Sequence, residues 1–254
     1  MNQPGLPAYQ RIAAAFRDQI TSGALPPGRQ LPTEHEIARE FDVARQTARN
    51  GLALLVAEGL IVARRPAGHF VVEREHMIYR PQDESRPQPP NPTMDRYGQQ
   101  ITAEGRVPSQ KIEVALIEAP ADIAERLEVP VGEVIVVRRR LRFINGEPVN
   151  TNDSHYPLDV VQGSEIMAPA DVARGTNQVL ADLGYPQTRA TDQFFWRMPT
   201  PAEIHRLQLG RGTPIVIHYV TGYTADGRPV RCTVNLLPSN HTIVVERTFE
   251  RAWQ

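Results

Sequence analysis

The sequence contains one cysteine, Cys232, among its 254 residues. A single cysteine cannot form an internal disulfide, and sparse cysteine usage is typical of a reducing compartment. No run of apolar residues approaches the roughly 20 that are needed to cross a bilayer. Residues 1–7 lack the charged start and apolar middle of a secretion signal. We therefore expect a cytoplasmic protein with no membrane partner.

The chain also lacks an excess of either charge, with a formal net charge of -1 at pH 7. Proteins that bind nucleic acid often carry a basic domain, but binding responds to the local potential rather than to the total charge. Between Ala44 and Phe70 only Glu58 opposes four arginines, which are Arg45, Arg49, Arg64 and Arg65. The positive charge is therefore concentrated in one short stretch.

Length and composition favour two modest domains. The chain is 41% hydrophobic and 22% charged, which is ordinary for a globular protein, and 254 residues can build two cores. We expect one domain over residues 1–76, a linker over residues 77–92 and a second domain over residues 93–254. The linker is predicted because residues 81–92 are rich in proline and contain no aliphatic side chain.

The first 60 residues have the pattern of three helices. Apolar residues at helical spacing predict a first helix over residues 8–21, followed by Gly23 as a left-handed cap. A capping box at Thr33 and Glu36 predicts a short helix that ends near Phe41. A third helix is expected over residues 45–57, with Ala48, Leu52 and Leu55 facing inward and Arg45, Gln46, Arg49 and Asn50 facing outward.

Two β-rich runs, residues 60–62 and 70–72, then predict a hairpin. Two short helices joined by a tight turn can place the second helix in a major groove. Arginine can bond guanine through two donors, Gln46 could pair with adenine, and Thr47 suits a phosphate. Arg64, Arg65 and His69 near the hairpin could touch the backbone or the minor groove. The alternative is that these arginines only form a solvent-exposed helix face with no DNA contact.

Residues 9–71 resemble the GntR-type winged helix-turn-helix. The resemblance is carried by Leu25-Pro26-Pro27-Gly28, by Leu31-Pro32-Thr33-Glu34, by residues 43–49, by Glu58-Gly59-Leu60-Ile61 and by Gly68-His69-Phe70-Val71. It implies a homodimer that binds double-stranded operator DNA. The DNA-binding residues expected from the pattern and the resemblance are Thr33, His35, Arg45, Gln46, Thr47, Arg49, Arg65, Gly68 and His69.

Three positions depart from this family pattern. His35 stands where arginine is frequent, and Ala44 replaces a serine or threonine whose hydroxyl could cap the helix or bind phosphate. Gly51 lies inside the third helix, where glycine costs about 1 kcal/mol relative to alanine. These departures could change which operator is read.

Beyond the linker the sequence predicts an α+β domain with a largely antiparallel sheet. Strands are expected near residues 107–118, 132–144, 147–156, 188–197, 213–223 and 229–237, and helices near 120–128, 171–183 and 200–208. In the second of these strands Ile135, Val137, Leu141 and Phe143 alternate with Arg138, Arg140 and Arg142. Guanidiniums in a row repel one another unless an anion or carboxylates neutralise their charge. Such a row predicts either a ligand pocket or a water-facing strand paired with Asp153 or Glu147.

The second half of the chain resembles the HutC-type, or UTRA, effector domain, which is related in fold to chorismate lyase. Carrying residues include the segment 138–149, Ser154-His155-Tyr156-Pro157 and Asp226-Gly227-Arg228-Pro229-Val230. The resemblance implies effector contacts at Arg140, Arg142, Ser154 and Tyr156, and strand alternation adds Arg231 and Asn235. Guanidiniums favour an anionic or hydroxyl-rich ligand. Arg231 stands where sugar-sensing members often have a glutamate, so the same ligand is not expected here. No cofactor and no metal are expected.

We therefore predict a ligand-responsive transcription regulator, a repressor that a small polar metabolite releases from its operator. An enzyme of the chorismate lyase type is one alternative. It lacks support because the sequence has no nucleophile elbow and no histidine pair at metal-ligand spacing. A ligand-independent architectural or plasmid repressor is the other alternative, and a ligand-induced rise in melting temperature would separate it from a sensor.

Overall fold

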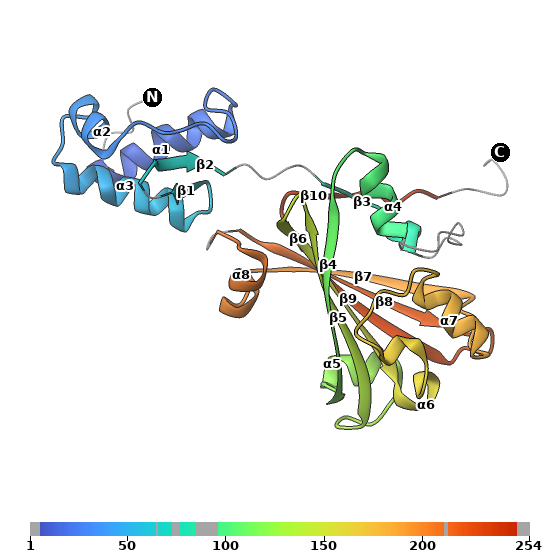
Figure 1. Ribbon diagram of the computed structural model, residues 1–254. Coiled ribbons are helices and arrows are strands. Elements are labelled where there is room, and N and C mark those ends of the chain that lie inside the picture. The colour runs from blue at the N-terminus through green and yellow to red at the C-terminus, as the bar shows by residue number, and fades with distance from the viewer. Residues whose placement is uncertain (1–5, 65, 73–76, 85–95, 211–212, 248–254) are drawn as a thin grey trace, which may run out of the picture. The chain divides into compact units, whose positions relative to one another are not determined.

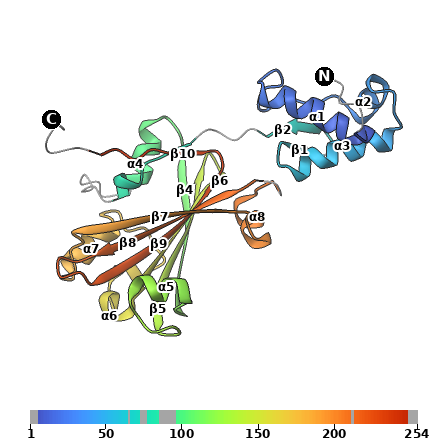
Figure 2. The ribbon, with the colours of Figure 1, turned by 180° about the vertical axis from the view of Figure 1, so that it is seen from behind.

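The computed structural model describes residues 6–64, 66–72, 77–84, 96–210 and 213–247. The chain divides into two compact units. One unit comprises Met1–His76 with Met198–Pro214, and the other comprises Met77–Arg197 with Ile215–Gln254. Figures 1 and 2 show, from opposite sides, a helical unit that ends in a small hairpin and a unit built on one large sheet. Among the described residues, no helix is long and apolar enough to cross a membrane.

The N-terminal unit begins with the three helices that the sequence predicts. These are α1 (Ala8–Thr21), α2 (Glu34–Glu40) and α3 (Arg45–Ala57). Gly23 follows α1 with a φ of +78°, which confirms its expected left-handed conformation. The capping box of α2 is also confirmed. Glu36 donates its backbone N–H to Thr33 Oγ1 at 3.3 Å, and Thr33 donates its own to Glu36 Oε2 at 2.7 Å.

The apolar stripes of these helices meet in one core. Its buried members are Ile12, Ala13, Phe16, Leu31, Ile37, Ala48, Leu52, Leu55, Ile61 and Val71. Gly51 also faces this core, and a Cβ atom there would lie 2.8 Å from Ile12 Cγ2 and 3.0 Å from the carbonyl oxygen of Tyr9. The glycine that weakens α3 as an isolated helix therefore lets α1 pack closely against it.

The predicted hairpin is present as β1 (Ile61–Arg64) and β2 (Gly68–Val71), which pair antiparallel. The segment just before α2 fastens this hairpin to the helices. Leu31 donates its N–H to the carbonyl oxygen of His69, and Val71 donates its N–H to that of Arg29, each at 2.8 Å. Three helices and a hairpin held in this way form a winged helix-turn-helix.

The second unit contains a six-stranded antiparallel sheet, as expected. Its strands are β4 (Pro108–Glu118), β5 (Val134–Ile144), β6 (Glu147–Pro157), β7 (Arg189–Arg197), β8 (Ile215–Tyr223) and β9 (Pro229–Pro238), in the order β4-β5-β6-β9-β8-β7. Asn145 and Gly146 join β5 to β6 with positive φ at both positions, as a two-residue hairpin turn with the correct twist requires. This turn sets the register of the central hairpin.

Helices cover both faces of the sheet. On one face α5 (Ala121–Leu127) packs against Ile135 and Cys232. On the other face lie α6 (Leu158–Val161), the 3-10 helix η2 (Glu165–Met167) and α7 (Thr176–Asp182), which pack with Val136 and Tyr156. Ile135 and Val136 are neighbours on β5 and therefore point to opposite faces, so the two clusters lie on opposite sides of the sheet.

Several short elements differ from the sequence predictions. Residues 77–84, expected in the linker, instead form β3 (Met77–Tyr79), which pairs parallel with β10 (His241–Ile243), and the 3-10 helix η1 (Pro81–Glu84). Burial of Met77 and Tyr79 explains why this stretch is ordered despite the prolines that follow it. The helix α4 (Arg96–Ala103) was not predicted.

The segment that connects β7 to β8 leaves the sheet and includes α8 (Pro201–Leu207). Residues 198–214 group with the N-terminal unit, whereas the sequence placed them in the second domain.

Candidate nucleic-acid interface and ligand-binding face

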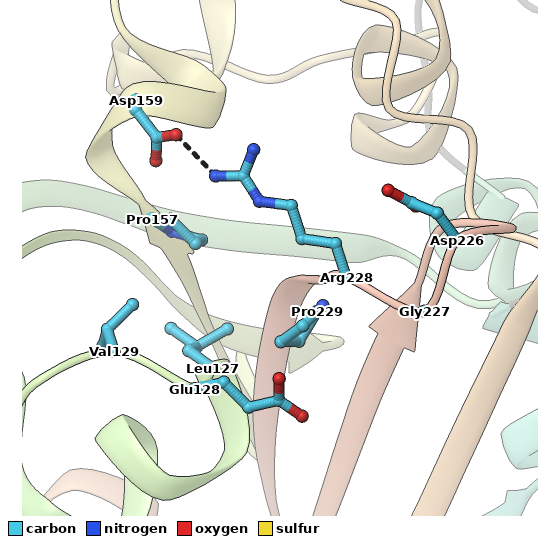
Figure 3. A pocket seen from close by; sticks show the side chains of 9 residues that line it. All are labelled: Leu127, Glu128, Val129, Pro157, Asp159, Asp226, Gly227, Arg228 and Pro229. Atoms are coloured by element: carbon cyan, nitrogen blue, oxygen red, sulfur yellow. Dashed lines mark hydrogen bonds and ion pairs between the residues drawn. The ribbon is translucent and has the colours of Figure 1, made fainter.

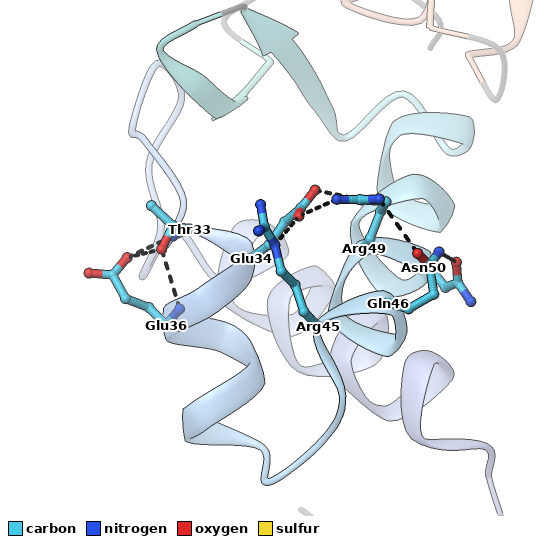
Figure 4. Close-up of polar contacts among 7 residues, drawn as sticks. All are labelled: Thr33, Glu34, Glu36, Arg45, Gln46, Arg49 and Asn50. Carbon is cyan, nitrogen blue, oxygen red and sulfur yellow. Dashed lines mark hydrogen bonds and ion pairs between the residues drawn. The ribbon is translucent and has the colours of Figure 1, made fainter.

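The outer face of α3 presents polar side chains to solvent, as predicted. The side chains of Arg45 and Arg49 are 67% and 52% exposed. Gln46 donates from Nε2 to Asn50 Oδ1 at 2.9 Å, one turn further along the helix (Figure 4). The start of α3 has no side-chain cap, which agrees with the missing hydroxyl at Ala44. The face is therefore a row of exposed donors on a rigid helix.

Glu34 of α2 lies beside two of these donors, and the charge balance expected from the sequence is wrong on this point. Its carboxylate accepts from Arg49 Nε and Nη2 and from Arg45 Nε, each at 2.9 Å (Figure 4). These hydrogen bonds, that from Arg49 first, lower the pKa of Glu34 to about 2 against the opposing effect of burial. The carboxylate thus holds two guanidiniums side by side and neutralises one of them.

The acid that was expected to oppose these arginines is engaged elsewhere. Glu58, just beyond α3, pairs with Arg17 of α1, with Nη2 and Oε1 2.6 Å apart. That ion pair joins the C-terminal part of α1 to the C-terminal end of α3. The carboxylate beside the outer face of α3 is therefore that of Glu34. Glu34 precedes the arginine-rich stretch from Ala44 to Phe70, so the local charge of that stretch does not include it.

Other predicted DNA contacts lie at the start of α2 and on the hairpin. His35 is exposed, while the hydroxyl of Thr33 is occupied in the capping box. Gly68 has a φ of +108°, and a Cβ atom there would lie 3.2 Å from Gln30 Nε2. Burial lowers the pKa of His69, and the Glu34 carboxylate opposes that shift. Arg65 lies outside the described residues.

Thr47 is half-buried, and its backbone N–H donates to the carbonyl oxygen of Ala44 at 2.8 Å. Arg64 lies 5.2 Å from the ring centroid of Phe70, a cation–π distance that holds its guanidinium along the hairpin. Exposed arginines of α3 and the hairpin thus belong to one compact unit, as a groove-reading element requires.

One face of the large sheet is lined by buried polar side chains, and we call it the polar face. Its members are Arg138, Arg140 and Arg142 of β5, Asn150, Asn152, Ser154 and Tyr156 of β6, His218 of β8, and Arg231, Thr233 and Asn235 of β9. All six predicted effector residues belong to this set. The alternative of a water-facing strand is wrong, because Arg138, Arg140 and Arg142 are at most 8% exposed.

Arg138 serves the fold. Its guanidinium donates from Nη1 to the carbonyl oxygens of Ala168 at 2.6 Å and Ile166 at 3.3 Å, and from Nη2 to that of Ala170. Three backbone acceptors, one within η2 and two just after it, therefore hold this charge. Arg138 fastens the loop between α6 and α7 over the polar face.

The centre of the polar face is a hydrogen-bonded network. Arg140 donates from Nη1 to Asn152 Oδ1 at 2.7 Å, and Asn152 donates from Nδ2 to Asn235 Oδ1 at 2.7 Å. Ser154 Oγ lies 3.0 Å from Thr233 Oγ1 and 3.5 Å from the Arg140 guanidinium. Strand register thus brings together Arg140, Ser154 and Asn235, as predicted. Asn152 was not predicted, although it lies two residues from Ser154 on the same strand face.

Arg142 and Arg231 lie at opposite ends of the polar face. Arg142 is opposite Asn150, whereas Arg231 lies beyond the pair His155 and Cys232, so at ~3.3 Å per residue the two are separated by about 20 Å along the strands. Arg142 stacks over the ring of Tyr97 at 4.3 Å, and Arg231 donates to Asn177 Oδ1 at 2.6 Å.

These two arginines are buried without a carboxylate. Arg142 is 8% exposed and Arg231 is 5% exposed, and within the described ranges neither forms an ion pair and each has an Nε atom without a hydrogen-bond partner. The hydroxyl of Tyr156, in a fully buried side chain, also lacks a partner among these residues. Burying a guanidinium without a counter-charge costs several kcal/mol, which an anionic ligand would offset.

His218 is a member of the polar face that sequence reasoning missed. Its Nε2 lies 2.7 Å from Asp192 Oδ1, its Nδ1 lies 2.9 Å from the hydroxyl of Tyr79, and its ring stacks on Phe194 with centroids 4.2 Å apart. The alternation of the strand over residues 213–223 was the available signal. It puts His218 between Val216 and Val220 on the inward face, where a histidine needs partners.

A separate hollow of about 360 Å³ lies near α5 and the turn between β8 and β9. Its lining includes Leu127, Glu128 and Pro157, and its arginine, Arg228, pairs with Asp159 (Figure 3). None of the predicted effector residues lines it. Its lining carries three carboxylates, Glu128, Asp159 and Asp226, against one arginine, so it does not suit the anionic ligand that the polar face favours.

Comparison with known proteins assigns both units. The family model for the UTRA domain matches residues 103–242, and the model for bacterial regulatory proteins of the gntR family matches residues 8–71. The chain belongs to the GntR family. It is a GntR transcriptional regulator with a UTRA domain, which is an effector-binding C-terminal domain. Its DNA-binding unit and its relatives are those of regulators, so the alternative of an enzyme is not favoured.

The curated relatives match this GntR regulator over most of their length. A HTH-type transcriptional regulator of Streptomyces coelicolor is 28% identical over 245 residues, covering 92% of this chain and 89% of the relative. The HTH-type transcriptional repressor NagR of Bacillus subtilis is 26% identical over 226 residues, covering 89% and 88%. The crystal structure of PhnF from Mycobacterium smegmatis has a TM-score of 0.55 at 20% identity, covering 93% of this chain and 99% of that one, and supports the fold.

Proposed function

We propose that this GntR regulator is a homodimeric repressor that leaves its operator when an anionic, hydroxyl-rich metabolite binds the polar face. The observation that carries the effector half of the proposal is the burial of guanidiniums beside neutral donors and acceptors. The name of NagR, a repressor that this chain resembles along most of its length, supports repression.

The DNA-reading part of the proposal rests on α3 and the hairpin. We infer that Arg45, Gln46 and Arg49 contact base edges in a major groove, and that Thr47 contacts a phosphate. Thr33, His35, Arg65, Gly68 and His69 would add contacts to the backbone or the minor groove. An operator with two half-sites follows if the protein is a dimer, because each protomer carries one reading helix. Such a regulator acts in the cytoplasm, where bacterial DNA lies.

The effector part of the proposal rests on the chemistry of the polar face. Guanidiniums bind carboxylate or phosphate oxygens through parallel hydrogen bonds, while asparagine and serine can both donate to and accept from hydroxyls. We infer that Arg140, Ser154, Asn235 and Asn152 contact the ligand centrally. Arg142 would contribute from one end of the polar face, and Tyr156 and Arg231 from the other. The two ends are too far apart for one small ligand to span the backbone positions of both.

The division of labour that we propose gives DNA binding to residues 1–76 and effector binding to residues 93–254. Residues 77–92 join the two, and within that segment β3 pairs with β10 in the sheet-containing unit. Deletion of residues 1–76 should leave a fragment that still binds the effector. A fragment that folds but binds no effector would contradict this division.

A thermal-shift assay tests the effector half of the proposal. Glucose 6-phosphate is the probe, because it joins a phosphate to several hydroxyls, and glucose and inorganic phosphate are its matched halves. If it binds, a concentration of about 100 times the Kd stabilises the protein by about 2.7 kcal/mol, a rise in Tm of several degrees.

The Arg140→Ala variant should lose this shift, whereas Arg139→Ala, on the opposite face of the same strand, should retain it. Carboxylated sugars extend the panel. If no phosphorylated or carboxylated probe raises Tm in the wild-type protein, the ligand-independent repressor is the better account.

A further inference from the structure

The strand β3 is the first element of the sheet-containing unit after the wing. β2 ends at Val71 and β3 begins at Met77, so β3 is where the chain that leaves the wing joins this unit. It is three residues long, and among the described strands its partner is β10. Met77 donates its N–H to the carbonyl oxygen of Asn240, and Val244 donates its N–H to that of Tyr79, each at 2.9 Å.

Side chains must therefore contribute much of what holds β3 in place. Tyr79 is buried and packs with Val216, Leu237 and the partly buried Phe194. Its hydroxyl reaches the polar face, where it lies 2.9 Å from Nδ1 of His218. A hydroxyl that bonds into a buried network fixes one orientation of the strand more strictly than apolar packing does.

The partners of His218 determine which atom donates. Its Nε2 faces the Asp192 carboxylate at 2.7 Å, and a carboxylate only accepts, so Nε2 carries the proton. In the neutral ring Nδ1 is then an acceptor, and the Tyr79 hydroxyl donates to it. The amide Nδ2 of Asn235 also lies 3.5 Å from Nδ1, as a second and longer donor.

These contacts join into one chain of hydrogen bonds across the sheet. Arg140 of β5 donates to Asn152 of β6 at 2.7 Å, which orients that amide so that its Nδ2 donates to Asn235 Oδ1 of β9, also at 2.7 Å. The oxygen of Asn235 is thereby turned away from His218 and its nitrogen turned toward it. The direction of each amide in the chain depends on the donor before it.

We propose that this chain, from Arg140 through Asn152, Asn235 and His218 to Tyr79, couples occupation of the polar face to the attachment of β3. The inference rests on the proposed effector function of that face. A ligand anion that draws Arg140 away removes the donor that favours the present direction of the Asn152 amide. A reversed Asn152 presents its oxygen instead of its nitrogen to Asn235, which favours reversal of the Asn235 amide as well. Reversed, Asn235 turns its oxygen toward the Nδ1 lone pair, and this repulsion displaces His218 from Tyr79.

The two amide directions give the chain two discrete states, which is what allosteric coupling requires. In the state described here β3 is held by Tyr79, and in the other that bond is weakened. A ligand shifts the balance only because it binds the two arrangements of Arg140 with different affinity. Asp192 holds the Nε2 edge of the His218 ring and Phe194 stacks on its face, so the displacement is a movement of the Nδ1 edge away from the Tyr79 hydroxyl.

A double-mutant cycle read by amide hydrogen exchange tests the coupling in the full-length protein without any ligand. Tyr79→Phe removes the hydroxyl that bonds His218 and keeps the ring, so we expect the exchange rates of the β3 and β10 amides to rise about five- to tenfold. Arg140→Met changes a residue of β5, three strands from the β8 strand that carries His218, and should raise the same rates at least twofold. In the double variant the rates should equal those of Tyr79→Phe alone, because the chain is already broken at its end.

Matched controls separate coupling from general loosening. Arg139→Met changes the neighbouring residue on the opposite face, and Tyr223→Phe removes a tyrosine hydroxyl elsewhere in the sheet. Both should leave exchange in β3 unchanged. If Arg140→Met reduces the folded fraction, Asn152→Ala breaks the chain at the next residue and replaces it in the cycle.

Unchanged β3 exchange in a folded Arg140 or Asn152 variant would overturn the inference, as would rates in the double variant that equal the product of the single effects. The cycle needs no effector. Its failure therefore leaves the proposed function standing, whereas the absence of any ligand-induced Tm shift would remove that function and leave the cycle interpretable.

Discussion

Replacing Glu34 by glutamine tests how the reading surface of α3 is held. The carboxylate accepts two hydrogen bonds from Arg49 and one from Arg45, all at 2.9 Å. Both arginines are more than half exposed, so solvent screens the pairs, and exposed pairs contribute about 0.2–1 kcal/mol each. We expect Glu34→Gln to lower the free energy of unfolding of this unit by about 1 kcal/mol at pH 7.

The effect must depend on pH in a definite direction. The pKa of Glu34 is lowered from 4.5 to about 2, so its stabilisation is complete above pH 4.5 and is lost as the pH falls toward 2. Hydrogen exchange of the α3 amides measures this difference between the wild-type protein and Glu34→Gln at pH 7 and, where the fold persists, near pH 3. Glu40→Gln, an exposed position on the same helix, is the control and should show no difference.

DNA binding should respond in two opposite ways. Without Glu34 the surface gains one positive charge, so binding to random duplex should strengthen and the slope of log K against log salt should steepen by about 0.9. The two guanidiniums also lose their fixed orientation, so the ratio of operator to random binding should fall. Fluorescence anisotropy between 50 and 200 mM salt measures both quantities. An unchanged slope together with an unchanged ratio would refute this account of Glu34.

Three further changes give shorter tests. Arg49→Ala should cost about 1–3 kcal/mol of specific binding and relax the preference at one operator position, which binding to single-base operator variants measures; equal loss at every sequence would make Arg49 a phosphate contact. Gly51→Ala gains about 1 kcal/mol of helix propensity, but its Cβ would lie 2.8 Å from Ile12 Cγ2 and would force Ile12 to move. Thermal unfolding should therefore show a net loss of stability of about 1 kcal/mol, and stabilisation would contradict the close packing. Burial raises the pKa of Cys232 to about 11, so the folded protein at pH 8 should react with iodoacetamide far more slowly than the urea-unfolded chain, and similar rates would show that the thiol is accessible.

Local sequence patterns predicted the elements that local physics determines. The capping box at Thr33, the glycine after α1 and the alternation of arginines in β5 each depend on residues within a few positions of one another. Each was confirmed with boundaries that agree closely. Alternation also predicted correctly which arginines share a face, because a strand has a side-chain period of two.

Contacts between distant segments could not be predicted in the same way. β3 and β10 are three residues each and pair across most of the chain, so neither has a periodic signal. The pairing of Glu34 with Arg45 and Arg49 depends on the angle between α2 and α3, and the bond from Tyr79 to His218 depends on where β3 lies. For the polar face, sequence indicated that Arg140 and Asn235 share a site but not that Asn152 joins them.

The central claim is that the exposed face of α3 reads bases. Selection of duplexes from a random pool by the purified protein at moderate ionic strength, with Arg49→Ala in parallel, tests it most directly. The account predicts an enriched sequence with two related half-sites in the wild-type selection, and a weaker preference at one position of each half-site in the variant. No enrichment over the starting pool, with or without anionic metabolites, would contradict it.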